Sequence, residues 1–185
     1  MKHYIYAQST LGRVLLTSDG CSLTGVYFVG QKYAPIPAGE PANDPGRVPF
    51  AQARAELAQY FAGERQQFGV PLAPEGTPFQ QHVWRALAAI PYGTTVSYAE
   101  LARSLGAPRS VRAVAAAIAR NPIAILIPCH RVIGSNGSLR GYAGGLERKR
   151  ALLGLEACAE TAPAGNASSR LPGAASSVLT IKFAA

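Results

Sequence analysis

The hydrophobic pattern of the first third of the chain predicts a small unit of strands and one helix. Two β-rich runs, His3–Thr17 and Leu23–Val29, flank the turn pair Asp19-Gly20, and this arrangement predicts a hairpin. The stretch 35–49 is crowded with proline and glycine and is predicted to be a loop. Apolar residues then recur at helical spacing over residues 50–61, which predicts a helix.

A change in pattern marks a boundary between two domains. Residues 63–78 are rich in glycine, proline and polar side chains, and Thr77 then provides an N-cap with proline at the first helical position. The fold class expected is α/β (α+β). We predict an N-terminal α/β domain over residues 1–76, a mostly helical C-terminal domain over 77–156 and a mostly disordered tail over 157–185.

The C-terminal half has the pattern of a helix-turn-helix. Ser97 and Glu100 form a capping box that opens a short helix, and Gly106 follows as its stop signal. After a turn, Ser110 can cap a second helix over residues 111–120. Because αα-hairpins are common, this pattern alone leaves DNA binding and plain helix packing both open.

The second of these helices is thin, because five of its side chains are alanine. Its backbone can approach a partner closely, and Arg112 protrudes near its start, which suits insertion into a narrow groove. The alternative is a helix packed tightly in the core, with Arg112 as a charge at its rim. Asn121-Pro122 ends the helix, since the residue before proline is pushed out of the α region, and the asparagine can bridge backbone groups across the break.

A cysteine follows the apolar run Ile123–Ile127, which lies between two prolines and is predicted to be a buried extended segment. The position of Cys129 at the end of this run predicts exposure, and His130 beside it is a candidate base. Such activation lowers a cysteine pKa from about 8.5 to about 5–6. Adjacent residues of an extended chain point to opposite faces, so a water bridging His130 and Cys129 is expected.

A carboxylate completes this candidate site. In a final helix from about Leu146 to Glu156, Glu156 falls on the same stripe as Leu146 and Leu153 and is predicted to point inward. A buried carboxylate needs a partner, and His130 is the candidate. Cysteine, histidine and glutamate together form a relay of the kind used in nucleophilic catalysis.

The distribution of charge along the chain bears on the kind of partner it binds. The chain has 185 residues and a formal net charge of +8, and residues 93–156 carry nine basic side chains against three acidic ones. This asymmetry favours a polyanionic partner, nucleic acid first, although a solvated surface is the alternative. Without an apolar leader or a run of about 18 apolar residues, we expect a soluble, cytoplasmic protein with its three cysteines reduced.

The segment Pro128-Cys129-His130-Arg131-Val132 carries a specific resemblance. Together with Asn121-Pro122, Gly141-Tyr142 and Gly144-Gly145-Leu146, it resembles the active site of the O6-alkylguanine-DNA alkyltransferases, also called methylated-DNA-protein-cysteine methyltransferases. The resemblance implies an RNase H-like sheet in the N-terminal domain. It also implies irreversible, single-turnover transfer of the alkyl group from O6 of guanine, or less readily O4 of thymine, to Cys129 without a cofactor.

The resemblance also assigns roles to other residues. The thin helix enters the minor groove and Arg112 fills the space of the flipped nucleotide, with Ser110, Ala113 and Ala116 also at the DNA. Tyr98 crowds the target phosphate and donates to the guanine, and Asn121 is a hinge. The expected partner is double-stranded DNA containing O6-alkylguanine, bound by a monomer; cooperative binding stays open. The guanine pocket is bordered by Val132, Tyr142 and Ala143.

Two features depart from the family. Ala143 stands where some relatives carry serine, and Ala115 and Ala116 stand where glycine is common, so the tolerated alkyl size and the approach to DNA can differ. Some relatives bind zinc in the N-terminal domain, but the few cysteines and histidines there predict no metal site. Two other functions remain: a module that senses alkylated DNA without repairing it, and a thiol hydrolase that uses Cys129, His130 and Glu156.

Overall fold

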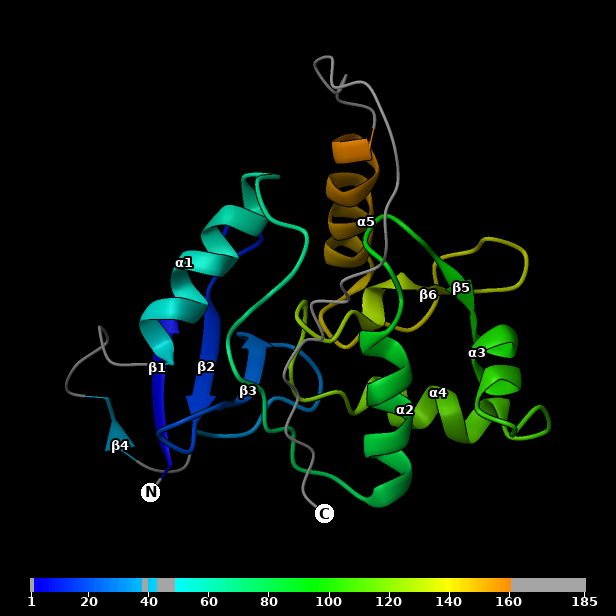
Figure 1. Ribbon diagram of the computed structural model, residues 1–185, viewed down its shortest axis with the longest axis horizontal. Coiled ribbons are helices and arrows are strands. Elements are labelled where there is room, and N and C mark those ends of the chain that lie inside the picture. Colours follow the sequence, from blue (N-terminus) through cyan, green and yellow to red (C-terminus); the bar gives the residue numbers. More distant parts are fainter. Residues whose placement is uncertain (1, 38–39, 43–48, 161–185) are drawn as a thin grey trace, which may run out of the picture.

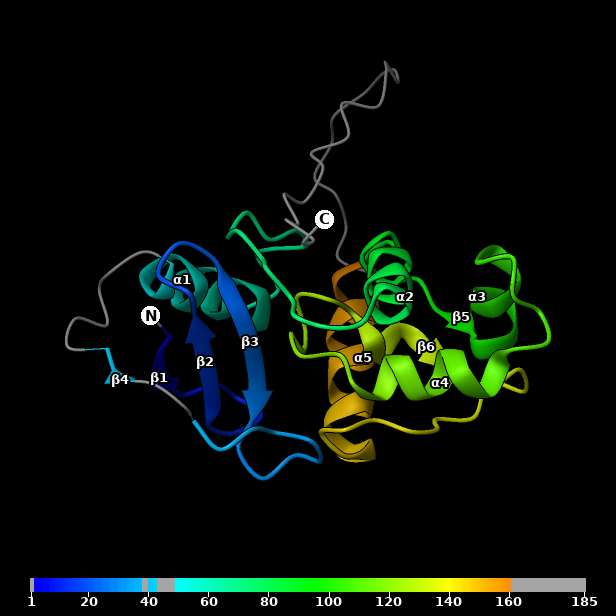
Figure 2. The same cartoon turned by 90° about the horizontal axis from the view of Figure 1, so that it is seen from below.

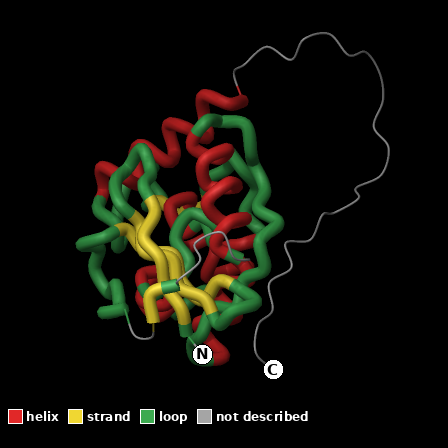
Figure 3. Tube along the Cα trace, turned by 90° about the vertical axis from the view of Figure 1, so that its left-hand side faces the viewer, coloured by secondary structure: helices red, strands yellow, loops and turns green. Residues whose placement is uncertain are grey.

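The computed structural model describes residues 2–37, 40–42 and 49–160, and Figure 1 shows a sheet with one helix beside a group of helices. The sheet has the strand order β3-β2-β1-β4, antiparallel except for the parallel pair β1 and β4. Its strands are β1 (His3–Ala7), β2 (Val14–Ser18), β3 (Leu23–Phe28) and β4 (Glu40–Pro41). The helix α1 (Phe50–Phe61) lies beside the sheet. Figure 3 views the molecule from the side on which the strands lie.

The first predicted β-rich run is two strands and not one. Ser9 and Gly12 exchange backbone hydrogen bonds of 3.2 and 3.1 Å, and Gly12 has φ +108°, a conformation that a side chain would disfavour. The run therefore turns back on itself, and β1 pairs with β2. The hairpin predicted around Asp19 is confirmed between β2 and β3, where the Asp19 side chain accepts hydrogen bonds from the backbone of Cys21 and Ser22.

The C-terminal half is helical, as predicted. Thr77 and Ser97 both form complete capping boxes, with Gln80 and Glu100 as their partners. Ser110 precedes its helix but makes no side-chain capping bond, because its backbone has ψ 26° and not the extended geometry that aims a cap at the first turn. The elements are α2 (Pro78–Ala88), α3 (Tyr98–Ser104), α4 (Val111–Ala119), a 3₁₀ turn η1 (Cys129–Arg131), α5 (Leu146–Glu160) and the short parallel strands β5 (Val96–Ser97) and β6 (Val132–Ile133).

The apolar run before Cys129 is buried as predicted, but it is not extended. Only Ile123 bridges to a strand, Val26 of β3; the chain then turns, with backbone hydrogen bonds from Leu126 to Ala124 and from Ile127 to Ile123. Ile125 at the turn has φ 72°, a left-handed conformation that is strained for a β-branched residue. The bridge to β3 joins the two halves of the molecule, which Figure 2 shows side by side, with α5 on the side of the helical half that faces the sheet.

The last helix is longer than predicted and is turned differently. It continues to Glu160, over the first residues of the predicted tail, and the remaining residues 161–185 lie outside those described. Leu146 is 44% exposed and does not belong to the inner face, which is formed by Lys149, Leu152 and Glu156. The inward direction predicted for Glu156 is nevertheless correct. Within the described ranges, every helix is too short or too polar to cross a membrane.

Candidate active site

Cys129 lies at the start of η1 and is 7% exposed, so the exposure predicted for it is wrong. The chain turns just before this residue, and the Cys129 amide donates to the Ile127 carbonyl at 2.8 Å. Burial raises the pKa of Cys129, and the nearby Asn121 amide and the Lys149 charge offset only part of that rise. The predicted fall in this pKa therefore has the wrong sign, and the thiol holds its proton until a base takes it.

The contact predicted between His130 and Glu156 is present. His130 Nε2 lies 2.8 Å from Glu156 Oε1, and both side chains are buried. An ionised carboxylate can only accept, so Nε2 carries the proton and, in the neutral ring, Nδ1 has the free lone pair. Nδ1 is buried and has no hydrogen-bond partner among the described residues. Burial lowers the pKa of His130, against the opposing effect of Glu156, so the neutral ring is favoured.

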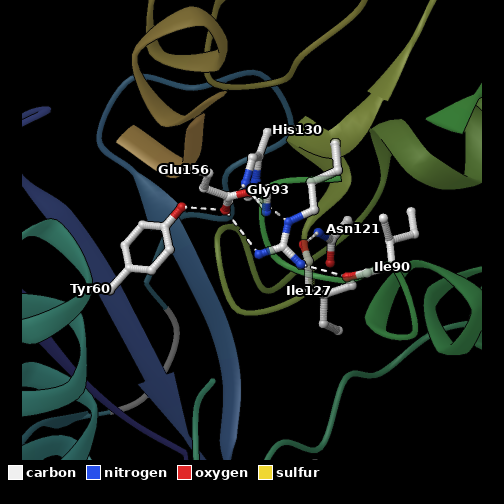
Figure 4. A network of polar contacts seen from close by, with 8 residues as sticks. Tyr60, Ile90, Gly93, Asn121, Ile127, His130 and Glu156 are labelled. Atoms are coloured by element: carbon white, nitrogen blue, oxygen red, sulfur yellow. Dashed lines mark hydrogen bonds and ion pairs between the residues drawn. The ribbon is translucent and has the colours of Figure 1, made fainter. Parts of the chain in front are cut away.

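Glu156 is the centre of a larger polar network (Figure 4). Arg131 binds both of its oxygens, with Nε 2.8 Å from Oε2 and Nη2 2.9 Å from Oε1. Tyr60 donates its hydroxyl to Oε1 at 2.7 Å, and the Gly93 amide donates to Oε2 at 3.3 Å. Burial by itself raises the pKa of Glu156, but the hydrogen bonds from His130 and Arg131 outweigh it and bring the value to about 2. The carboxylate is ionised at any working pH.

Asn121 ties the end of α4 to the segment that carries the cysteine. Its amide nitrogen donates to the carbonyls of Ile127 at 2.8 Å and Ile123 at 3.3 Å, and its amide oxygen accepts from the Ile123 backbone at 3.1 Å. These bonds close the turn on which Cys129 stands, and they confirm that Asn121 bridges backbone groups across the break after the helix.

Tyr98 and Tyr142, two residues predicted to contact the guanine, both lie near Cys129. Tyr98 donates to the carbonyls of Arg140 and Gly141 at 3.0 and 3.2 Å, while burial and the neighbouring Cys129 raise the pKa of Tyr142 well above its usual range. The Tyr142 hydroxyl has no hydrogen-bond partner among the residues described. Val132 is buried in β6, and the Ala143 carbonyl accepts from the Lys32 amide at 3.0 Å.

The α4 helix has one buried face and one exposed face. Val114, Ala117 and Ile118 pack inward, and the Trp84 indole of α2 donates to the Ala117 carbonyl at 2.9 Å. The exposed face carries Ser110 before the helix and Arg112, Ala113 and Ala116 along it. Core packing therefore explains Ala117, while the exposed face with Arg112 and the small alanines is free to contact a partner.

Comparison with known proteins agrees with this geometry. The family model for the ribonuclease-like domain of 6-O-methylguanine DNA methyltransferase matches residues 2–74, and the model for the DNA-binding domain of the same family matches residues 78–158. The chain belongs to the 6-O-methylguanine DNA methyltransferase family. Family, mixed α/β fold class and enzyme class, all predicted from the sequence, are thereby confirmed.

Relatives of this methyltransferase cover nearly the whole described chain. The methylated-DNA–protein-cysteine methyltransferase of Mycobacterium tuberculosis is 49% identical over 84% of this chain and 93% of its own length. The protein of the same name from Methanosarcina acetivorans is 48% identical over 83% and 97%. A crystal structure of Mycobacterium tuberculosis OGT in complex with DNA superposes with a TM-score of 0.79, at 48% identity over 85% of this chain and 94% of that one. The methyltransferase acts on DNA in repair.

Several residues of this methyltransferase site carried no clear signal in the sequence. Arg131 is part of the motif, but the sequence does not indicate that it binds the same carboxylate as His130. Both residues contact Glu156 from the 3₁₀ turn η1. Lys149 is wholly buried, donates to the carbonyls of Val132 and Arg140, and has its pKa lowered to about 8 by burial; its inward position could have been found from its spacing with Glu156 on one helix face. Tyr60 lies 96 residues from Glu156 and had no signal at all.

Proposed function

We propose that this protein repairs O6-alkylguanine in double-stranded DNA by taking the alkyl group onto Cys129. The observation that carries the proposal is the buried pair of His130 and Glu156, with His130 next in sequence to a buried thiol. A thiol with a raised pKa needs a base at the moment of reaction, and a neutral imidazole held by a carboxylate is such a base. The proton passes from Cys129 to His130 Nδ1 through one water, because Nδ1 has no direct hydrogen bond to the thiol.

The transfer is a single displacement. The sulfur of Cys129 forms a bond to the alkyl carbon while the bond from that carbon to O6 breaks, and its electron pair stays on the guanine. The guanine anion then takes up a proton, so the thiol hydrogen is in effect exchanged for the alkyl group. A thioether has no route back to a thiol here, and each molecule therefore acts once, without a cofactor. O4-alkylthymine is the poorer substrate. A reducing, cytoplasmic environment keeps the acceptor thiol from forming a disulfide.

Access to the alkyl group requires that the nucleotide leave the duplex. The exposed face of α4 supports an approach through the minor groove, with Ser110, Ala113 and Ala116 near the backbone and Arg112 filling the space left in the stack. The relative crystallised with DNA supports a DNA-bound state of the same fold. The protein binds as a monomer in this proposal, and cooperative binding is a separate question for solution measurements.

The flipped guanine lies against Val132, Tyr142 and Ala143. Its exocyclic amine donates to the carbonyls of Cys129 and Val132; the latter already accepts from Lys149, and a carbonyl has a second lone pair for the guanine. Tyr98 stabilises the departing anion together with the Ala143 amide. For this, the Tyr98 hydroxyl exchanges its hydrogen bond to Arg140 or Gly141 for one to the base.

The test is a single-turnover repair assay on duplex DNA with one O6-methylguanine. The loss of lesion should stop at one equivalent per protein molecule, and Cys129→Ser should repair nothing. Cys21→Ser and Cys158→Ser are matched controls at the two exposed cysteines and should repair at the normal rate. Many turnovers per molecule would indicate a hydrolase, and binding without loss of the lesion would indicate a sensor; either would overturn the proposal.

A further inference from the structure

One hydrogen bond to the active-site carboxylate comes from the other domain. Tyr60 lies in the last turn of α1, in the ribonuclease-like domain, and its hydroxyl donates to Glu156 Oε1 at 2.7 Å. The same oxygen is 2.8 Å from His130 Nε2. Glu156 Oε1 therefore accepts hydrogen bonds from Tyr60 and His130, as well as from Arg131 Nη2, and a stronger bond from one donor weakens the others. Figure 4 shows the Tyr60 hydroxyl pointing at the Glu156 carboxylate.

The Tyr60 hydroxyl is fixed in place by the packing of its ring. The side chain is completely buried, and its ring lies 5.4 Å from that of Phe68 and 6.1 Å from that of Tyr92, centroid to centroid. Burial and the negative charge of Glu156 raise the pKa of Tyr60 far above its usual range, so the hydroxyl remains a donor at every working pH. A fixed, permanently protonated donor holds the carboxylate in one orientation.

We propose that Tyr60 is a positioning residue for alkyl transfer, which orients Glu156 and limits how strongly that carboxylate attracts the proton of His130. The inference rests on the proposed role of His130 as the base. It gives the ribonuclease-like domain a part in the chemistry of the DNA-binding domain. A donor to a carboxylate spreads its negative charge, so the imidazolium beside it is stabilised less and the ring stays neutral to lower pH.

The sign of the effect follows from the groups around the pair. Tyr60 comes from α1, Gly93 from the turn after α2, and Arg131 from η1, while Lys149 of α5 and Arg131 both disfavour a charged His130. Removal of the tyrosine hydroxyl leaves these cations in place but gives Glu156 one donor fewer. The pKa of His130 must then rise. Further titratable groups here are Tyr92, whose ring packs on Tyr60, and Cys129, which precedes His130 in the chain.

Tyr60→Phe tests the proposal because it removes only the hydroxyl. The His130 ring is titrated by ¹⁵N NMR in the full chain without DNA, and the rate of transfer from O6-methylguanine duplex is measured against pH. The midpoint of the His130 titration should move upward on the order of half a pH unit, since only part of the free energy of the lost charge-assisted hydrogen bond affects the charge state of the ring. The acidic limb of the rate should move with it, while DNA affinity stays unchanged.

Tyr27→Phe is the matched control, because Tyr27 is a half-buried tyrosine of the same domain that does not contact Glu156. It should leave the His130 midpoint and the rate profile as they are. A fluorinated tyrosine at position 60 is a stronger donor of the same shape, and it should move the midpoint downward even if the phenylalanine variant folds poorly.

If neither position-60 variant changed the His130 titration, Tyr60 would be a packing residue and the proposal would be wrong. The same conclusion holds if the ring stays neutral in every protein until it unfolds. The NMR titration does not depend on transfer. Absence of repair by the unaltered protein would therefore overturn the proposed function and still leave the Tyr60 result readable.

Discussion

Nε2 of His130 and Oε1 of Glu156 are 2.8 Å apart, with side chains that are 0% and 1% exposed. The low pKa of Glu156 fixes the direction of this bond, because an ionised carboxylate accepts and the imidazole must donate. The opposite ring nitrogen is then the basic atom of the site. A buried, uncharged base suits a buried, protonated thiol, since neither carries a charge before the reaction begins.

Glu156→Gln should impair both folding and repair. The substitution leaves the Arg131 guanidinium buried without its anion, and breaking a buried pair in this way costs about 3 to 5 kcal/mol. Urea denaturation measures the loss, and the transfer rate should fall even where the variant is fully folded. Glu75→Gln is the control: it breaks an exposed pair with Lys2, worth at most about 1 kcal/mol. Equal losses from the two variants would contradict the network.

The free energy of unfolding should decrease as the pH falls from neutrality. Burial holds the pKa of His130 below 6.5, so the unfolded chain binds the proton first and is favoured below that pH. Glu156 adds a second loss between its ordinary value of 4.5 and its folded value of about 2. Urea midpoints across this range measure both steps, and His130→Gln should remove the first one. A stability that rises on acidification would be incompatible with these burial effects.

Asn121→Ala should loosen the turn under Cys129. The buried Ile123 amide loses its partner, and an unsatisfied buried group of this kind costs about 1 to 3 kcal/mol; the Ile127 carbonyl keeps its bond from Cys129 but loses the one from Asn121. We expect lower stability by denaturation and a slower transfer rate, because the thiol is no longer held in one place. Asn136→Ala, in the exposed loop after β6, removes the amide oxygen that accepts two hydrogen bonds from Ser138, and it should leave the rate unchanged. A normal rate in Asn121→Ala would refute the positioning role.

Arg112→Ala should weaken repair of duplex DNA more than reaction with the free alkylguanine base, because only the duplex requires extrusion of a nucleotide. The two rates are measured with the same protein preparation. Arg54→Ala, an exposed arginine of α1, controls for the loss of one positive charge. If Arg112→Ala lost the same factor on both substrates, Arg112 would have no role in flipping.

Local signals in the sequence predicted two helix starts and the direction of one buried side chain correctly. Thr77 and Ser97 mark helix starts because a capping box is made by residues three positions apart, and the inward direction of Glu156 follows from helical spacing. Ser110 is the exception, since its identity does not determine its backbone angles. The segment Pro128–Val132 predicted the family, which the comparisons confirm.

Contacts between distant segments could not be predicted. Tyr60 meets Glu156 only because the fold brings the end of α1 to the buried face of α5, and periodicity within one helix does not predict such a contact. Burial of Cys129 depends on a turn in which Ile125 has a left-handed conformation. An unbroken apolar run predicts an extended segment and gives no sign of this turn. The predicted sign of the thiol pKa shift was wrong for the same reason.

Identification of the alkylated atom tests the central claim most directly. The protein is incubated with duplex DNA containing one O6-methylguanine, digested, and its peptides are analysed by mass spectrometry. We predict a methyl group on the sulfur of Cys129, in an amount equal to the lesion lost, and none on Cys21 or Cys158. Loss of the lesion with an unmodified Cys129, or a methyl group on another residue, would contradict the account.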